Sequence, residues 1–128
     1  MSPSEARRVV YLAGGFKSGW QAQVIEQLPS LDFLDPSQHE IQDPAEYTRW
    51  DLNAIRASDI VLGYMESTNP GGYSLALEIG FAHALGKKVL LVDEIDDPSV
   101  SKYFEMVRQC SGRVFATLDQ AVDHLRKL

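Results

Sequence analysis

One carboxylate, Glu78, stands inside an otherwise apolar stretch at residues 75–85, which only Glu78 and His83 interrupt. Burying a carboxylate costs free energy unless the group is hydrogen-bonded or its pKa shifts, so packing alone seldom places one there. A partly desolvated carboxylate can instead act as a nucleophile or as a tuned acid or base. The pattern marks Glu78 as a candidate catalytic group if its helix face borders a pocket; the alternative is an exposed residue on the solvent side of the helix.

A glycine-rich segment at residues 14–19 is the second place where we expect ligand chemistry. It leads from a strand into a helix, and backbone N–H groups at a helix N-terminus can hold an anion. Because the segment is neither G-x-G-x-x-G nor a P-loop, it gives little support for a dinucleotide or a triphosphate, and a simple strand-to-helix turn is the alternative. The candidates for contact with a phosphate or a sugar are Gly14, Gly15, Phe16, Lys17 and Ser18.

The elements that must position these residues alternate between strand and helix along the whole chain. Apolar, β-branched runs predict five buried strands, at residues 8–13, 31–34, 60–64, 89–92 and 113–116. Helical spacing predicts helices at residues 20–28, 44–57, 75–85, 98–110 and 118–125, with a polar loop at 37–43. The residues expected to end these helices are Asp43, Ser74 and Thr117 as N-caps and Gly86 as the glycine after the third helix.

This alternation predicts an α/β fold with a doubly wound, five-stranded parallel sheet, a flavodoxin-like or Rossmann-like three-layer α/β/α arrangement in the strand order 2-1-3-4-5. In such sheets ligands bind outside the carboxyl ends of the strands, where the strand order reverses. That point lies between the first and third strands, beside residues 14–19 and 66–74. Glu78, expected about one turn into the next helix, should point toward this crevice.

Length and composition limit the class of protein. The 128 residues predict one domain spanning 1–128, and 45% hydrophobic with 23% charged residues is ordinary for a globular protein. A net charge of −6 argues against a nucleic-acid partner. The first eight residues lack the apolar core of a signal peptide, and no apolar stretch is long enough to span a membrane. We therefore expect a cytoplasmic protein without a membrane partner.

Neither the cysteine nor the histidines predict a metal site. The single cysteine, Cys110, permits no internal disulfide and no cysteine-based metal cluster, and we expect it to be half-buried. His39, His83 and His124 lack metal-ligand spacing, and His83 lies about 140° around its helix from Glu78. We expect surface or half-buried histidines, with no metal and no cofactor.

Three segments together resemble one known family. They are VYLAGGF at residues 10–16, DLNAIRASDIVL at 51–62 and LEIGFAHALGKKV at 77–89. Their order and spacing resemble the nucleoside 2-deoxyribosyltransferase family and the related nucleoside 5′-monophosphate N-glycosidases, over nearly the whole chain. The resemblance implies that Glu78, in the E-[IL]-G-[FY]-A signature, attacks the anomeric carbon of a sugar and forms a covalent glycosyl-enzyme. It implies that Asp51, in D-L-x-x-I, protonates the leaving base, and that Tyr11 orients the nucleophile.

The implied reaction follows the two-carboxylate chemistry of retaining glycosyl transfer, in which one carboxylate attacks while the other assists the leaving group. A second base then accepts the sugar in a transferase, or water accepts it in a hydrolase. The implied partner is therefore a small-molecule nucleoside or nucleotide. Taken singly, Asp51 would be an ordinary helix carboxylate and Tyr11 a tyrosine of the strand core.

The chain departs from the family at the position six residues before Glu78. Deoxyribosyltransferases often carry an acidic base-binding residue there and the nucleotide hydrolases a phosphate-binding serine, whereas this chain has Gly72. Asn69 or Ser74 are candidates to substitute for it. The family also takes a polar residue from a neighbouring subunit near the start of the fifth strand, for which Ser111 is the nearest candidate. The resemblance thus implies a homodimer or a larger homo-oligomer.

Several alternatives remain open at this stage. Trp50, next to Asp51, could stack near the base, whereas Trp20 is expected to pack against the sheet. A nucleoside 5′-monophosphate N-hydrolase is the alternative within the same chemistry. Gly72 motivates an alternative of another class, a non-catalytic nucleotide-binding or sensing module. A phosphoacceptor receiver domain would need acidic residues after the first and third strands, and the third strand ends in Gly-Tyr-Met at residues 63–65.

Overall fold

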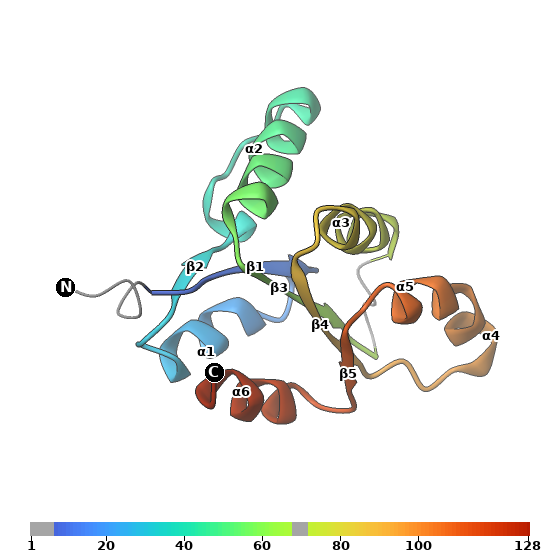
Figure 1. Cartoon of the computed structure of the whole chain (residues 1–128). Coiled ribbons are helices and arrows are strands. Elements are labelled where there is room, and N and C mark those ends of the chain that lie inside the picture. Colours follow the sequence, from blue (N-terminus) through green and yellow to red (C-terminus); the bar gives the residue numbers. More distant parts are fainter. Residues whose placement is uncertain (1–6, 68–71) are drawn as a thin grey trace.

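A five-stranded, fully parallel sheet forms the centre of the computed structural model, which describes residues 7–67 and 72–128 (Figure 1). The strand order is β2-β1-β3-β4-β5, and each neighbouring pair is parallel. This arrangement confirms the fold class predicted from the sequence. The strands are β1 (Val9–Gly14), β2 (Asp32–Leu34), β3 (Ile60–Met65), β4 (Lys88–Asp93) and β5 (Arg113–Phe115).

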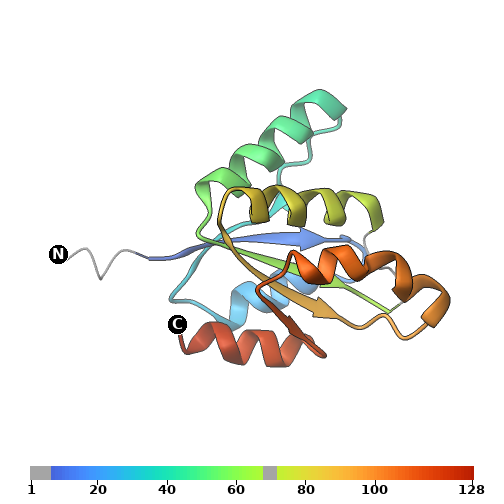
Figure 2. The same ribbon diagram turned by 45° about the vertical axis from the view of Figure 1, so that its right-hand side comes forward.

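Helices cover both faces of the sheet, as the two views in Figures 1 and 2 show. One face carries α1 (Trp20–Gln27) and α6 (Leu118–Arg126). The other carries α2 (Pro44–Ala57), α3 (Gly72–Ala84) and a segment made of α4 (Pro98–Ser101), the 3₁₀ turn η3 (Lys102–Phe104) and α5 (Glu105–Gln109). A further 3₁₀ turn, η2 (Pro36–Gln38), follows β2.

The alternation of side chains along β1 decides which residues reach the candidate site. Val10 and Leu12 belong to the hydrophobic cluster under α1 and α6, which also contains the buried Trp20. Tyr11 and Ala13 point to the opposite face and join the cluster under α2 and α3. Tyr11 therefore shares a sheet face with the helices that carry Asp51 and Glu78.

Local hydrogen bonds fix the start of α2 and the end of α3. The Asp43 side chain accepts a hydrogen bond from the Glu46 N–H at 3.0 Å, and Pro44 occupies the first turn of α2, as predicted. Gly86, with φ 74°, ends α3, and the Lys87 N–H reaches the Ala82 carbonyl at 3.0 Å. Together with the hydrogen bond from the Gly86 N–H to the His83 carbonyl at 3.1 Å, this bond forms a Schellman ending, which confirms the predicted glycine stop.

Two predictions about the helices were wrong, one for the start of α3 and one for the continuity of the helix expected at 98–110. α3 begins at Gly72, so Ser74 lies inside its first turn and is not the N-cap, and Glu78 stands nearly two turns into the helix. The expected continuous helix at 98–110 is interrupted by η3. The Arg108 side chain donates to the Ser101 carbonyl at 3.1 Å and to the Ser101 hydroxyl at 2.6 Å, which satisfies polar groups at the interruption.

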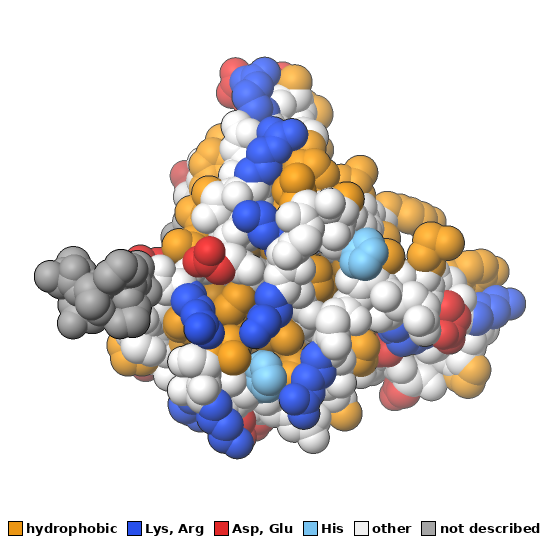
Figure 3. Space-filling view, viewed as in Figure 1, with side chains coloured by type: hydrophobic (Ala, Val, Ile, Leu, Met, Phe, Trp, Pro, Cys, Tyr) orange, Lys and Arg blue, Asp and Glu red, His pale blue; other side chains and the backbone are white. Residues whose placement is uncertain are grey.

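Several exposed apolar side chains lie on the outer surface of α3 and of the α4–α5 segment. Figure 3 shows hydrophobic side chains gathered over this region at the right of the view. Four large apolar side chains on this surface are exposed, namely Tyr73, Leu77, Tyr103 and Met106.

No helix within residues 7–67 and 72–128 is long and apolar enough to cross a membrane.

Close packing of α3 on the sheet depends on Gly63 in β3. A Cβ atom at this position would lie 3.0 Å from Ile79 Cδ1, 3.1 Å from Leu75 Cδ1 and 3.3 Å from Leu91 Cδ1. Contacts this short force buried neighbours to move, because protein interiors are already close-packed. Gly63 therefore sets the height of α3, and of Glu78 with it, above the sheet.

We expect the substitution Gly63→Val to lower the free energy of unfolding by about 1–3 kcal/mol, because it overpacks the contact between β3 and α3. Urea denaturation monitored by circular dichroism measures this change. Gly80→Ala is the matched control, since a Cβ there meets nothing within 4 Å and alanine favours the helix. A Gly63→Val protein as stable as the wild type would contradict this account of the packing.

Candidate active site

The candidate site is a cavity of about 620 Å³ bordered by the end of β1, the segment after β2, and helices α2 and α3. Gly14 allows the chain to leave β1 here, because its φ is 153° and a Cβ would lie 2.9 Å from the Tyr64 carbonyl oxygen. The cavity thus lies at the carboxyl edge of the sheet, where such folds bind ligands. Its lining residues are Tyr11, Gly14, Gly15, Phe16, Pro36, His39, Ile41, Tyr47, Asp51, Tyr73, Ser74 and Glu78.

Glu78 and Tyr11 form a buried hydrogen-bonded pair at this cavity. Tyr11 is 0% and Glu78 8% exposed, and the Tyr11 hydroxyl donates to Glu78 Oε2. Burial raises the pKa of Glu78 to about 7; the bond from Tyr11 opposes this shift and the charge of Asp51 adds to it. Burial and the Glu78 carboxylate both raise the pKa of Tyr11, so its hydroxyl stays protonated and remains a donor.

Asp51 lies half-buried on α2 and lines the same cavity. Burial raises its pKa, while a hydrogen bond from His39, with Nε2 3.1 Å from Asp51 Oδ1, lowers it. Two carboxyl groups with raised pKa values therefore border one cavity. Such a pair can combine a nucleophilic carboxylate with a second carboxyl that transfers a proton.

Neutralising Glu78 should stabilise the fold above neutral pH. A carboxyl whose pKa rises from 4.5 to about 7 on folding holds its proton more tightly in the folded state. Its contribution to stability is therefore complete below pH 4.5 and is lost as the pH rises through 7. Compared with the wild type, we expect Glu78→Gln to gain about 2–3 kcal/mol in free energy of unfolding between pH 5 and pH 8.5.

Urea denaturation of both proteins at the two pH values measures this gain. Glutamine can still accept the Tyr11 hydrogen bond, so the substitution removes the charge and keeps the contact. Glu94→Gln is the control, because Glu94 also accepts from a tyrosine, Tyr64, at 2.8 Å. An equal stability difference between Glu78→Gln and the wild type at both pH values would contradict the raised pKa.

The remaining residues proposed from the sequence fall into three groups. Gly14, Gly15, Phe16 and Ser74 line the cavity together with the three proposed catalytic residues. Gly72 begins α3, and Asn69 lies outside the described residues. Four other candidates do not line the cavity of this chain, namely Lys17, Ser18, Trp50 and Ser111.

Each of these four side chains has another environment. Lys17 and Ser18 are exposed, and the Ser18 hydroxyl donates to Glu66 at 2.9 Å. Trp50 packs edge-on against His39, with ring centroids 4.6 Å apart, and does not line the cavity. The Ser111 hydroxyl donates to the Val107 carbonyl at 2.8 Å. Lys17, Ser18 and Trp50 therefore do not line this chain's own cavity, whereas Ser111 is expected to serve the cavity of a neighbouring subunit. The contacts of these residues with a ligand stay predictions.

Sequence reasoning missed five lining residues, among them Tyr47 and His39. Tyr47 stands four residues before Asp51 on α2, so helical spacing alone could have placed both on one face. His39 offered no such signal, because it lies in an irregular segment between η2 and α2. The other three are Pro36, Ile41 and Tyr73.

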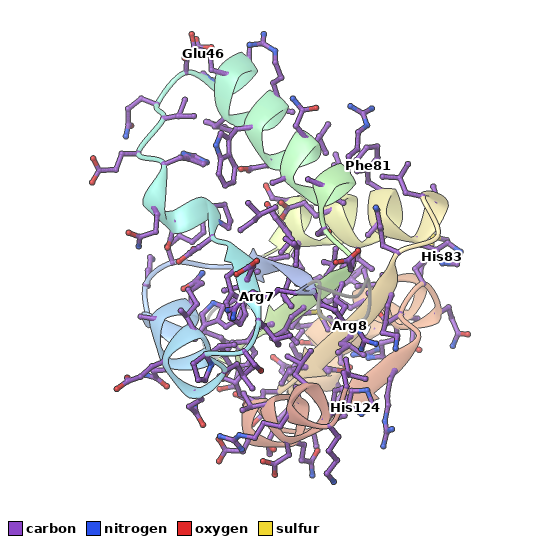
Figure 4. The ribbon with its side chains drawn as sticks, turned by 60° about the vertical axis from the view of Figure 1, so that its left-hand side comes forward. Arg7, Arg8, Glu46, Phe81, His83 and His124 are labelled. Atoms are coloured by element: carbon purple, nitrogen blue, oxygen red, sulfur yellow. The ribbon has the colours of Figure 1, made fainter. Side chains whose placement is uncertain are left out.

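The other histidines lie elsewhere. Figure 4 places His83 near the C-terminal end of α3 and His124 on α6, apart from one another. Within the described ranges, no three His, Cys, Asp or Glu side chains gather as metal ligands would. Cys110 is half-buried, as expected.

The fold and the site define an α/β protein whose cavity contains a Tyr–Glu pair and a second carboxyl group. Residues 7–95, well over half of the chain, match the protein family described as nucleoside 2-deoxyribosyltransferase like. The chain therefore belongs to this family, which confirms the resemblance seen in its sequence. No curated protein matches the chain by sequence.

Solved structures share the fold over almost the whole chain. A 2-desoxiribosyltransferase from Leishmania mexicana is 21% identical with a TM-score of 0.75, covering 94% of this chain and 97% of that one. A 2-deoxyribosyltransferase from Bacillus psychrosaccharolyticus is 20% identical with a TM-score of 0.70, covering 90% of each chain. The CMP N-glycosidase BcmB from Clostridium botulinum is 18% identical with a TM-score of 0.61, covering 94% of this chain and 100% of that one. At these identities the likeness shows the fold.

Proposed function

We propose that the protein is an enzyme that cleaves or exchanges the N-glycosidic bond of nucleosides or deoxynucleosides through a covalent glycosyl-enzyme on Glu78. The observation that carries the proposal is the buried Tyr11–Glu78 pair, with Asp51 lining the same cavity. Membership of the nucleoside 2-deoxyribosyltransferase-like family supports it. The similar structures named as deoxyribosyltransferases and as an N-glycosidase agree with this chemistry.

In the first step the ionised Glu78 carboxylate attacks the anomeric carbon of the bound sugar. Tyr11 holds Oε2 of Glu78, which leaves Oε1 as the attacking oxygen. As the carbon–oxygen bond forms, the bond to the base breaks and its electron pair passes to the base nitrogen. Protonated Asp51 donates its proton to the base, so that the base leaves as a neutral molecule.

The second step reverses these roles. A nitrogen of an incoming base, or a water molecule, attacks the anomeric carbon and releases the Glu78 carboxylate. Asp51, now ionised, accepts the proton that the attacking group loses. Two displacements at one carbon retain its configuration, so the product has the same anomeric stereochemistry as the substrate.

The charges around the cavity favour a nucleoside over a nucleoside 5′-monophosphate. Its described lining contains two carboxyl groups and no Lys or Arg. A phosphate would therefore meet negative charge without a cation to pair with it. The nucleoside 5′-monophosphate N-hydrolase remains the alternative, and Ser74 is the lining side chain that could contact its phosphate. The alternative of another class is a non-catalytic nucleotide-binding module, because Gly72 stands where the related enzymes carry a polar residue.

Chromatography of the wild-type protein incubated with nucleosides, deoxynucleosides and their 5′-monophosphates tests the proposal. Exchange of bases without net hydrolysis identifies a transferase. Steady release of base and sugar phosphate from monophosphates alone identifies the nucleotide hydrolase instead. Tight binding of nucleotides without cleavage of any substrate would contradict the enzymatic proposal and favour the binding module.

We also propose that the protein forms a homodimer or a larger homo-oligomer. The exposed apolar side chains of α3 and α5 offer a surface for a second copy, and Ser111 does not reach the cavity of its own chain. Light scattering that gives only the monomer mass would contradict this proposal. The single domain spanning 1–128 and the cytoplasmic location remain predictions from the sequence.

A further inference from the structure

His39 is held in one orientation between Asp51 and the backbone. Its Nε2 lies 3.1 Å from Asp51 Oδ1, and its Nδ1 accepts a hydrogen bond from the Ile41 N–H at 3.0 Å. A ring nitrogen that accepts a hydrogen bond carries no proton, so the proton of the neutral ring is on Nε2. The His39 ring therefore donates to Asp51 and accepts from the backbone.

Packing fixes the same orientation. The His39 side chain is 12% exposed, and its ring meets the edge of Trp50 with centroids 4.6 Å apart. Trp50 directly precedes Asp51 on α2, so the packing partner and the hydrogen-bond partner of His39 are neighbours on one helix. The ring is thus restrained both by contact and by hydrogen bonds, as a side chain that orients another must be.

We propose that His39 is a positioning residue for the reaction, because it holds Oδ1 of Asp51 and leaves Oδ2 as the oxygen presented to the base. This inference rests on the proposed function. With one oxygen engaged, the Asp51 carboxyl cannot rotate freely, and the proton moves to or from the base at a defined atom. Removing the His39 donor leaves the carboxyl free to turn and its Oδ1 without a partner.

The hydrogen bond also influences when Asp51 carries its proton. It lowers the Asp51 pKa, in opposition to burial, so its loss should raise that pKa. The other titratable groups that face this carboxyl are Glu78 from α3 and Tyr11 from β1, and the nearby Asp35 also acts on Tyr11. When kcat is plotted against pH, activity falls where Asp51 loses its proton. In a variant that lacks the His39 hydrogen bond, this fall should therefore move to higher pH.

Two substitutions separate the hydrogen bond from the packing. His39→Phe keeps a flat ring against Trp50 but has no donor, whereas His39→Gln keeps an N–H group that can reach Asp51. We expect His39→Phe to lower kcat about 10- to 100-fold with little change in KM, and His39→Gln to stay within about fivefold of the wild type. In an Asp51→Asn protein, His39→Phe should have almost no further effect.

A titration of ¹³C-labelled aspartate carboxyls by NMR in the ligand-free protein gives a readout that does not depend on activity. The Asp51 pKa should rise in His39→Phe and return toward the wild-type value in His39→Gln. An unchanged Asp51 titration in His39→Phe, an equal loss of kcat in both variants, or a full loss in the Asp51→Asn background would overturn the proposal. Failure of the wild type to release any base overturns the proposed function instead, and the titration still decides whether His39 acts on Asp51.

Discussion

Replacing Glu78 with alanine should lower the rate of base release at least about a thousandfold, because the variant lacks the carboxylate that forms the glycosyl-enzyme. The rate is measured by chromatography of the free base under saturating nucleoside. The variant should still bind the nucleoside, because the other cavity residues remain in place. A small anion such as formate or azide, which can enter the space left by the side chain, should restore part of the activity by attacking the sugar directly.

The matched control for this substitution is Glu94→Gln. Glu94 accepts a hydrogen bond from Tyr64 at 2.8 Å, as Glu78 does from Tyr11, but it does not line the cavity. Its loss should change base release less than about threefold, within the range of ordinary partly buried substitutions. Activity of Glu78→Ala within tenfold of the wild type would exclude Glu78 as the nucleophile.

Replacing Asp51 with asparagine should lower base release about 10²- to 10³-fold, because general acid catalysis by a positioned group contributes on this scale. Asparagine can still accept the His39 hydrogen bond through its carbonyl oxygen, so the change removes the transferable proton and retains the contact. The loss should depend on the leaving group. Substrates whose leaving group departs readily as an anion, such as a nitrophenyl deoxyriboside, should lose far less than natural nucleosides.

Glu46→Gln provides the control on the same helix. Glu46 lies at the N-terminal end of α2, as Figure 4 shows, and it does not line the cavity. We expect its substitution to change the rate less than about twofold, as for an exposed surface charge. If Asp51→Asn lost equal activity on good and poor leaving groups, Asp51 would not be the proton donor.

The architecture was predictable because the strand signals, the helix signals and the residues that end the helices all indicate the same fold. The strands buried on both faces are continuous apolar runs, Asp43 caps α2, and Gly86 ends α3. Glu78 could be found from physics alone, since it is a charge within an apolar helix. Asp51 and Tyr11 could not, because a helix carboxylate and a strand tyrosine are common, and only the family motifs singled them out.

The remaining contacts depend on how irregular segments fold back in three dimensions. His39 stands 12 residues before Asp51 in a stretch without helical or strand periodicity, so no spacing rule connects the two. Ser18 points to Glu66 rather than into the cavity, which the composition of its loop did not reveal. Glu66 lies 48 residues after Ser18 in the chain, so no spacing rule connects the two. The ligand contacts expected of Lys17 and Ser18 stay predictions.

Mass spectrometry can detect the proposed covalent intermediate on Glu78 directly. The protein is mixed with a deoxynucleoside in the absence of an acceptor base, quenched in acid and digested. We predict a mass increase of one deoxyribosyl residue on the peptide that contains Glu78, which disappears when an acceptor base is added and is absent from Glu78→Gln. Base release by a wild-type protein that never carries this adduct, together with an active Glu78→Gln variant, would contradict the account.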